Sequence, residues 1–246
     1  MPPTSVRPGP PARRRPPVIE DRVRFAWAGR LIGRAMALYV RLVAATARTS
    51  GPEVAQEQLI WAIWHESNLA TAVAALALRG DTQAIVFTTR GFRGIVMNAM
   101  LHGIGSGAVT VPPEGAAGRA EAASVSRAMS RLTREGWSVL ASCDGPFGPR
   151  RVVKPGVLIV ARESGLPVQP WALAIRPPLR LRRRWDQQLV PLPLCRLTVV
   201  EGRQLRLEPR ERIKPRLVEL QAELDRITAL AERRMAGRRT AARGRS

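Results

Sequence analysis

Short apolar runs alternate with helix-like segments along residues 59–200, and this alternation constrains the fold more than any other feature of the sequence. The strand-like runs are 59–64, 84–89, 108–111, 137–141, 168–175 and 197–200. Helix-like or amphipathic segments lie between most of them, at 70–78, 95–102, 122–132 and 155–163. Strands that alternate with helices favour an α/β fold. We therefore expect a single α/β domain with a central mixed sheet flanked by helices.

The predicted α/β domain spans residues 51–205, and other segments flank it. Residues 1–20 are rich in proline and arginine and have no apolar stretch, so we expect a disordered basic segment and not a secretory signal. Apolar residues at helical spacing predict a C-terminal helix over 206–235 that packs against the domain. Residues 236–246 are predicted to form a disordered basic tail.

The net charge of +21 is distributed unevenly along the chain. Residues 1–17 carry four arginines and residues 233–246 carry six, and neither segment contains an acid. Aromatic residues make up only 4% of the sequence. Because about half of the excess charge lies in these two segments and aromatic side chains are few, the composition does not favour specific nucleic-acid binding. A further arginine-rich segment, 176–184, is either a solvated loop or a patch that attracts phosphates, including lipid headgroups.

Residues 21–50 predict an amphipathic helix with a basic stripe. Arg30, Arg34, Arg41 and Arg48 fall within about 40° of one another at 100° per residue. Apolar side chains occupy much of the remaining surface. Such a segment is typical either of a helix in a membrane interface or of a helix that covers a domain and exposes one solvated face. No stretch of the chain is apolar and long enough to predict a membrane-spanning helix.

Two segments carry residues suited to chemistry. His65 follows a strand-like run and precedes a helix-like segment, where an imidazole can be presented for proton transfer. The loop 144–151 follows another strand, begins with Asp144 and ends with two arginines. Taken alone, Asp144 is better explained by an Asx-turn and His65 by a structural role. Because ligands of α/β proteins gather at the carboxyl ends of strands, we expect the two segments to form one site.

These motifs resemble the lysophospholipid acyltransferase superfamily. The resemblance covers about residues 58–202 and is closest to a bacterial branch with an Asp-Gly-Pro-x-Gly-Pro motif, related to the lipid A and glycerolphosphate acyltransferases. Its elements are Trp64-His65, the loop Asp144-Gly145-Pro146-Phe147-Gly148-Pro149-Arg150, the stretch 165–170, and Trp185-Asp186 followed by two prolines.

The resemblance implies acyl transfer to a hydroxyl group. In such a reaction His65 acts as general base on the acceptor hydroxyl, which attacks the carbonyl of an acyl thioester. The resemblance further implies an acceptor-binding loop made of Asp144, Gly145, Pro146, Gly148, Pro149 and Arg150, together with Pro170 from the later motif. The acceptor is expected to be a lysophospholipid or a glycolipid.

One position departs from the superfamily pattern. An acid that orients the imidazole is expected five residues after the histidine, and Ala70 stands there. Glu66 is the adjacent candidate for this catalytic role, and Asp81 and Asp144 are others. The departure leaves an alternative open: a non-catalytic lipid-binding protein that keeps the acyltransferase fold.

The resemblance also sets the expected partners. The donor is acyl-CoA or acyl carrier protein, and no metal or resident cofactor is expected. Anionic membrane lipids are expected partners of a peripheral protein at the cytoplasmic face of the bacterial inner membrane. Cys143 and Cys195 show no disulfide or metal-ligand pattern.

Overall fold

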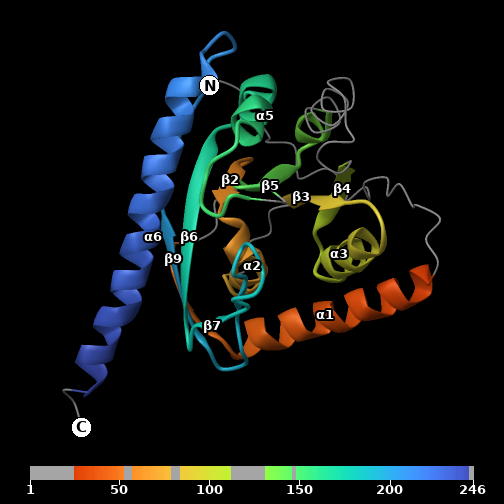
Figure 1. Cartoon of the computed structure of the whole chain (residues 1–246), viewed down its shortest axis with the longest axis vertical. Helices are drawn as coiled ribbons and strands as arrows, with labels where there is room; N and C mark the ends of the chain where they lie inside the picture. The colour runs from red at the N-terminus through yellow and green to blue at the C-terminus, as the bar shows by residue number, and fades with distance from the viewer. Residues whose placement is uncertain (1–24, 53–56, 79–83, 112–130, 146–147, 244–246) are drawn as a thin grey trace, which may run out of the picture.

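A seven-stranded mixed sheet forms the centre of the computed structural model, which describes residues 25–52, 57–78, 84–111, 131–145 and 148–243 (Figure 1). The strand order is β1-β9-β6-β2-β5-β3-β4. Its strands are β1 (Arg48–Ser50), β2 (Ile60–Ile63), β3 (Ala84–Thr89), β4 (Gly107–Val111), β5 (Ser138–Ser142), β6 (Val168–Arg176) and β9 (Arg196–Glu201). All neighbouring strands pair in parallel except β6 and β9, which are antiparallel. The α/β fold class and the mixed sheet predicted from the sequence are confirmed.

Helices cover both faces of this sheet. On one face lie α1 (Ala26–Thr46), α2 (Asn68–Ala77) and α3 (Phe92–Gly103), and on the other lie α5 (Gly156–Ser164) and α6 (Ile213–Arg243). Strand β2 shows why two cores form: Ile60 and Ala62 face the α5 and α6 core, whereas Trp61 and Ile63 face the α1 and α2 core. A strand that is buried on both faces is an unbroken apolar run.

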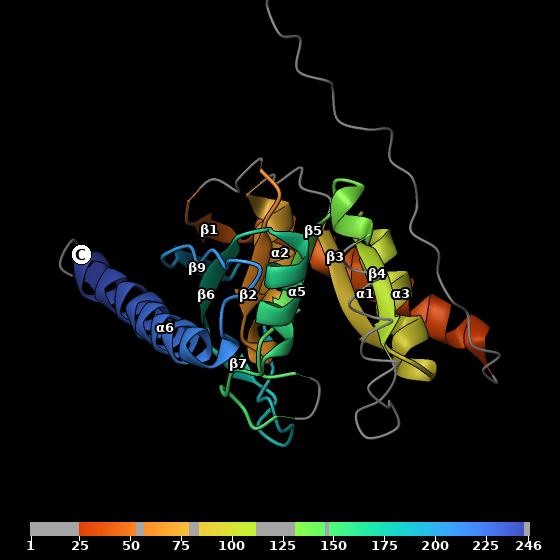
Figure 2. The ribbon, with the colours of Figure 1, turned by 90° about the horizontal axis from the view of Figure 1, so that it is seen from above.

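The two long terminal helices lie toward opposite ends of the sheet. Figure 2 shows α6 beside β6 and β9, and α3 together with α1 toward β3 and β4. Within the described residues, no helix is both long enough and apolar enough to span a bilayer.

The C-terminal helix packs as predicted but ends later than predicted. Its apolar residues Leu220, Leu224, Ile227 and Ala231 are fully buried against the domain. The helix continues to Arg243, although the sequence predicted disorder from residue 236. Alanine and arginine, which dominate these last residues, are strong helix formers. The predicted disordered segment 1–20 lies outside the described residues.

A second sheet of two short strands was not predicted. Strand β7 (Leu179–Arg180), within the arginine-rich segment, forms an antiparallel pair with β8 (Leu189–Val190), which follows that segment. Two-residue strands leave too little hydrophobic alternation for recognition in the sequence. This hairpin extends toward the carboxyl end of β2 and supplies several residues of the site.

Candidate active site

His65 lies two residues after the end of β2, at the first residue of the short 3-10 helix η1 (His65–Ser67) that leads into α2. Two anchors fix this turn. The indole Nε1 of the buried Trp64 donates a 3.1 Å hydrogen bond to the hydroxyl of Thr228 on α6. The backbone N–H of His65 donates to Oδ1 of Asp144 at 2.8 Å, which joins the ends of the neighbouring strands β2 and β5.

The imidazole of His65 is paired with a buried carboxylate. Its Nδ1 lies 2.9 Å from Oδ2 of Asp186, whose side chain is fully buried, whereas the His65 side chain is 22% exposed. The guanidinium of Arg184 donates to both Asp186 oxygens, at 2.9 and 2.8 Å. The ring of Trp185 packs against the imidazole, with 5.0 Å between ring centroids. The ring of His65 is thus held on two sides.

Asp186 remains ionised in this environment. Burial by itself raises the pKa of Asp186, but the hydrogen bonds and charge of Arg184, together with the hydrogen bond to His65, bring that pKa below its ordinary value. An ionised Asp186 can only accept a hydrogen bond, so in a neutral imidazole the proton lies on Nδ1. The lone pair of the imidazole is then on Nε2. In the described part of the chain, Nε2 has no hydrogen-bond partner, so it is available to accept a proton.

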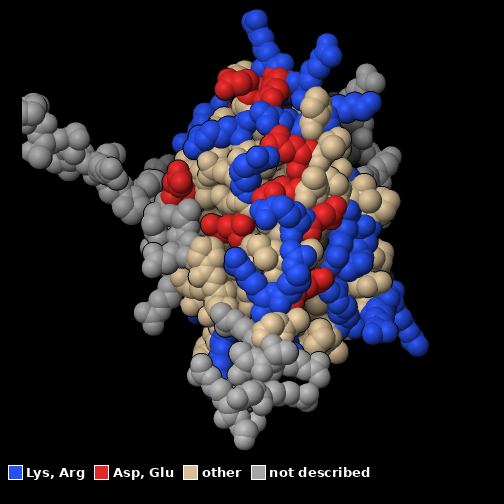
Figure 3. Space-filling view, turned by 90° about the vertical axis from the view of Figure 1, so that its left-hand side faces the viewer, with Lys and Arg blue, Asp and Glu red and all other residues tan. Residues whose placement is uncertain are grey.

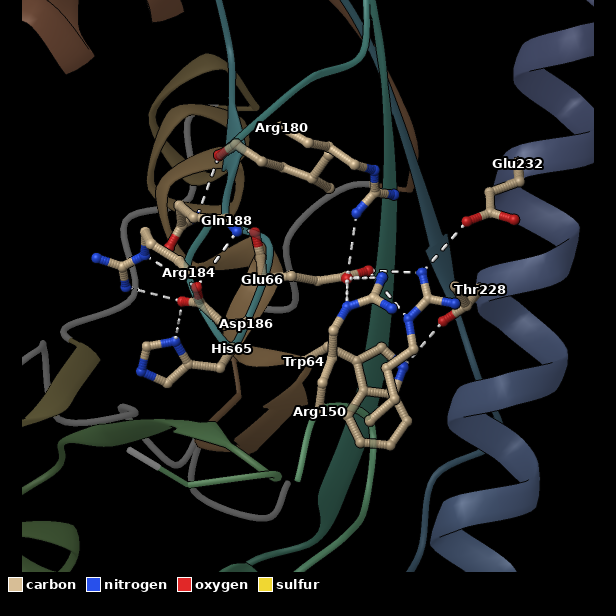
Figure 4. Close-up of polar contacts among 12 residues, drawn as sticks. Trp64, His65, Glu66, Arg150, Arg180, Arg184, Asp186, Gln188, Thr228 and Glu232 are labelled. Carbon is tan, nitrogen blue, oxygen red and sulfur yellow. Dashed lines mark hydrogen bonds and ion pairs between the residues drawn. The ribbon is translucent and has the colours of Figure 1, made fainter. Parts of the chain in front are cut away.

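Glu66 points away from the imidazole, into a group of arginines (Figure 4). Its buried carboxylate pairs with the side chains of Arg150, Arg151 and Arg180, which we call the arginine cluster. Arg150 donates through Nε at 2.7 Å and through a second guanidinium nitrogen, Arg151 at 3.1 and 2.6 Å, and Arg180 at 3.2 Å. Each guanidinium side chain remains about a quarter exposed (24–28%). Glu66 therefore gathers three cations beside His65 at the protein surface.

The carboxylate that contacts the imidazole therefore does not belong to any of the three acids that the sequence suggested. Glu66 contacts the arginine cluster, Asp144 contacts the backbone of His65, and Asp81 lies outside the described residues. Asp186 takes the orienting position instead. The signal for it was present, because Trp185-Asp186 is a lone acid directly after a run of arginines and belongs to the motif order of the resembling family.

Asp144 organises the loop that carries two of the arginines. It is fully buried, and its Oδ2 accepts a 3.0 Å hydrogen bond from the backbone N–H of Arg151. Burial raises the pKa of Asp144, and the hydrogen bonds from Arg151 and His65 oppose that rise. Arg151 adopts φ 57°, a left-handed conformation that is uncommon for a non-glycine residue. Its bonds to Asp144 and Glu66 hold this conformation and aim its side chain into the arginine cluster.

The remaining predicted site residues occupy two places. Gly145 and Gly148 are in the loop, and both have positive φ. A Cβ on Gly148 would lie 2.8 Å from the ring of Trp185, so a side chain there would displace the residue that packs on His65. Pro149 is exposed beside them, and Pro146 lies outside the described residues. Pro170 is buried within β6, beside Ala62 of β2, and its predicted role in substrate binding stays a prediction.

No described group of three or more histidine, cysteine, aspartate or glutamate side chains is arranged to hold a metal ion. Cys143 is buried beside Asp144, and burial raises the pKa of its thiol far above the ordinary value. A thiol in this state is a poor nucleophile. The imidazole of His65 is thus the group in the site best suited to accept a proton.

No protein-family model matches the chain, and no curated protein sequence matches it. The fold is nevertheless similar to that of one solved acyltransferase structure. That structure is the 1-acyl-sn-glycerophosphate acyltransferase PlsC from Thermotoga maritima, with a TM-score of 0.51 and 12% identical residues. The match covers 82% of this chain and 81% of PlsC. At this identity the likeness concerns the fold.

Proposed function

We propose that this protein is an acyltransferase that moves a fatty acyl group from an acyl thioester to a hydroxyl group. The observation that carries the proposal is the 2.9 Å hydrogen bond between Nδ1 of His65 and the buried carboxylate of Asp186. A partly exposed imidazole oriented by an ionised carboxylate is the arrangement of a general base. The acyltransferase fold of the chain supports the same reaction class.

The proposed reaction needs no group beyond the two substrates and His65. The acceptor O–H bond breaks as Nε2 takes the proton, and the acceptor oxygen forms a bond to the acyl carbon. The carbon–sulfur bond then breaks, and the leaving thiolate receives the proton from the imidazolium. The donor is acyl-CoA or acyl carrier protein. A base at the hydroxyl is required because an alcohol is too weakly acidic to attack at neutral pH without one.

The arginine cluster supports a phosphorylated or otherwise anionic acceptor. Three guanidinium groups face two carboxylates there, Glu66 and the Glu232 that contacts Arg151 at 3.3 Å, so positive charge is in excess. Guanidinium groups bind phosphate through paired hydrogen bonds. We infer that Glu66 positions the cluster and that a lysophospholipid or phosphorylated glycolipid places its headgroup there, with its hydroxyl near His65.

A non-catalytic lipid-binding protein is the second candidate, and Ala70 is the observation that favours it. Ala70 is fully buried in the core between α2 and the sheet, so position 70 supplies no carboxylate to the imidazole. Asp186 makes that contact from another part of the chain, and for this reason we favour the enzyme.

The test compares wild type with His65→Ala in an assay that measures free thiol released from acyl-CoA or acyl carrier protein, with a panel of lysophospholipid and glycolipid acceptors. His102→Ala is the matched control, because His102 is an exposed histidine on α3. We expect acceptor-dependent thiol release by wild type and by the control, and its loss in His65→Ala. Equal turnover by all three proteins would end the assignment of His65 as base. Vesicle or acceptor binding without any transfer by wild type would instead support the lipid-binding protein.

A further inference from the structure

Helix α6 contacts both parts of the site through one line of polar side chains. Gln221, Thr228 and Glu232, which we call the α6 polar line, fall within about 40° of one another at 100° per residue. They lie beside the apolar residues that α6 buries against the domain. Figure 4 shows Thr228 and Glu232 on α6, with their side chains directed toward Trp64 and the arginine cluster. Packing of this helix was predicted from the sequence, whereas its contact with the site was not.

Thr228 holds the residue that precedes the proposed base. Its hydroxyl donates to the backbone oxygen of Leu224 at 2.6 Å, so toward Trp64 it can only accept. The indole Nε1 of Trp64 supplies that hydrogen bond at 3.1 Å. Both side chains are buried, and within the described residues this N–H has no other acceptor. Thr228 thus fixes the orientation of the indole, and with it the start of the turn that presents His65.

Gln221 holds the loop that carries two arginines of the cluster. Its Nε2 donates to the backbone oxygen of Arg151 at 3.0 Å, and its Oε1 accepts from the backbone N–H of Val153 at 2.9 Å. Asp144 binds the backbone N–H of the same Arg151 from the other side, at 3.0 Å. The peptide groups before and after Arg151 are therefore both fixed. Because the φ of 57° at Arg151 is uncommon for a residue with a side chain, these bonds decide where its guanidinium points.

Glu232 adds a weaker contact to the same arginine. Its Oε1 lies 3.3 Å from a guanidinium nitrogen of Arg151, and the Glu232 side chain is 52% exposed. An ion pair with this much exposure contributes little. The partners of Thr228 and Gln221 are instead a buried indole and backbone groups. These two residues therefore carry the contact between α6 and the site.

The outward face of α6 has a different character. Figure 3 shows the side of the molecule that carries α6, where basic and acidic side chains are interspersed. Arg216, for example, pairs with Glu211 and Glu219. Exposed pairs of this kind are typical of a solvated surface. In the part of the chain that the structure describes, the hydrogen bonds from α6 to the site all come from the α6 polar line.

We propose that α6 is the positioning element of the site, in which Thr228 places the base and Gln221 places the arginine cluster. Both roles rest on the proposed function, acyl transfer by His65 to an anionic acceptor. Misplacement of a reacting group by about 1 Å can lower a rate about a hundredfold. A displaced base lowers kcat, whereas a displaced headgroup site weakens binding of the acceptor and raises its KM. The two residues therefore affect different kinetic constants.

The test is steady-state kinetics of the full chain with acyl-CoA and the panel acceptor that wild type uses best. Thr228→Val keeps the shape of the side chain and removes the hydroxyl, so we expect kcat to fall about tenfold and the acceptor KM to stay within about twofold. Thr228→Ser returns the hydroxyl and should recover most of the lost kcat. Gln221→Met keeps the length of the side chain and removes the amide. It should raise the acceptor KM about tenfold and leave kcat within about twofold.

Glu223→Met is the matched control. Glu223 is a buried polar residue of α6 whose carboxylate also accepts from a loop backbone N–H, that of Arg203. Arg203 follows β9, which is antiparallel to β6, so its loop lies toward the amino end of β6 and away from His65. The control should lower the midpoint of thermal unfolding and keep wild-type kcat and KM. If Thr228→Val and Gln221→Met changed only the midpoint, as the control does, the positioning roles would be overturned.

A second measurement separates these roles from the proposed reaction. The chain has two histidines, so comparison with His102→Ala assigns the imidazole NMR signals of His65. Thr228→Val should shift the His65 signals and leave those of His102 in place, and Gln221→Met should weaken binding of inorganic phosphate about tenfold. If wild type transferred no acyl group but both effects appeared, the reaction would fail and the positioning roles would stand. Unshifted His65 signals together with unchanged phosphate affinity would overturn the positioning roles, even in an active protein.

Discussion

The Nδ1 atom of His65 lies 2.9 Å from Oδ2 of Asp186, although the two residues are 121 positions apart in the sequence. His65 begins the helix after β2, and Asp186 comes from the turn between β7 and β8. The contact exists because the hairpin is folded against η1, where Gln188 also donates to the backbone oxygen of Glu66 at 2.8 Å. The orienting carboxylate thus comes from the turn between β7 and β8, and not from position 70 in α2, where the superfamily pattern places it.

Asp186→Asn should lower kcat by about a hundredfold or more and leave the KM for the acceptor nearly unchanged. An amide at this position can donate to Nδ1, and this would place the imidazole proton on Nε2, the atom that must accept a proton. Steady-state kinetics with acyl thioester and acceptor would measure both constants. Asp225→Asn, at an exposed position on α6, is the control and should have wild-type kinetics. A variant with unchanged kcat would show that Asp186 has no part in the chemistry.

The position of His65 could be predicted from the sequence, whereas its contact with Asp186 could not. A run of apolar residues that is buried on both faces predicts a strand, and a residue at its end lies at the carboxyl edge of the sheet. Asp186 depends on a hairpin whose strands have two residues each, so no periodicity indicates how it folds back. The expected acid position, Ala70, is fully buried in the core. The spacing expected from the superfamily therefore indicated position 70, but in this protein that position is part of the hydrophobic core.

The fold was easier to predict than the site because its core strands are long and apolar. The predicted run 84–89 coincides with β3, and 168–175 is one residue shorter than β6. Gly165, with φ 72°, ends α5 where the sequence placed the end of that helix. Strand β1 was missed, since Arg48, Thr49 and Ser50 carry no apolar pattern and pair with β9 only through the backbone register.

The acid stability of the protein should depend on Asp186. Its pKa is lower in the folded protein than the ordinary 3.8, so the unfolded chain binds more protons between those two values. The free energy of unfolding therefore rises with pH through this window. The contribution of Asp186 is fully present above the window and is lost as pH falls through the folded pKa. Urea unfolding at several acidic pH values should show a shallower dependence on pH for Asp186→Asn than for wild type. Parallel curves would contradict the assigned direction.

Glu66→Ala should lower the free energy of unfolding by about 3 kcal/mol, because it leaves three partly buried guanidinium groups without their shared carboxylate. Urea denaturation would measure the loss. Inorganic phosphate should recover more stability in this variant than in wild type, because an anion can replace the missing carboxylate among Arg150, Arg151 and Arg180.

The control for this variant is Glu219→Ala. Glu219 also contacts two arginines, Arg203 and Arg216, but on the surface of α6. Surface ion pairs contribute about 1 kcal/mol or less, so this change should be mild and insensitive to phosphate. If Glu66→Ala were no less stable than Glu219→Ala, the arginine cluster would not depend on Glu66.

Gly33→Ala should destabilise the protein by about 1–3 kcal/mol, because the added methyl group has no space between α1 and α3. Its Cβ would lie 2.4 Å from the backbone oxygen of Val96 and 2.5 Å from Cβ of Ala99, and neither atom can rotate away. Gly156→Ala is the matched control, since a Cβ there meets nothing within 4 Å. Thermal unfolding should show a lower midpoint for Gly33→Ala only. An unchanged midpoint would mean that α1 tolerates a wider separation from α3.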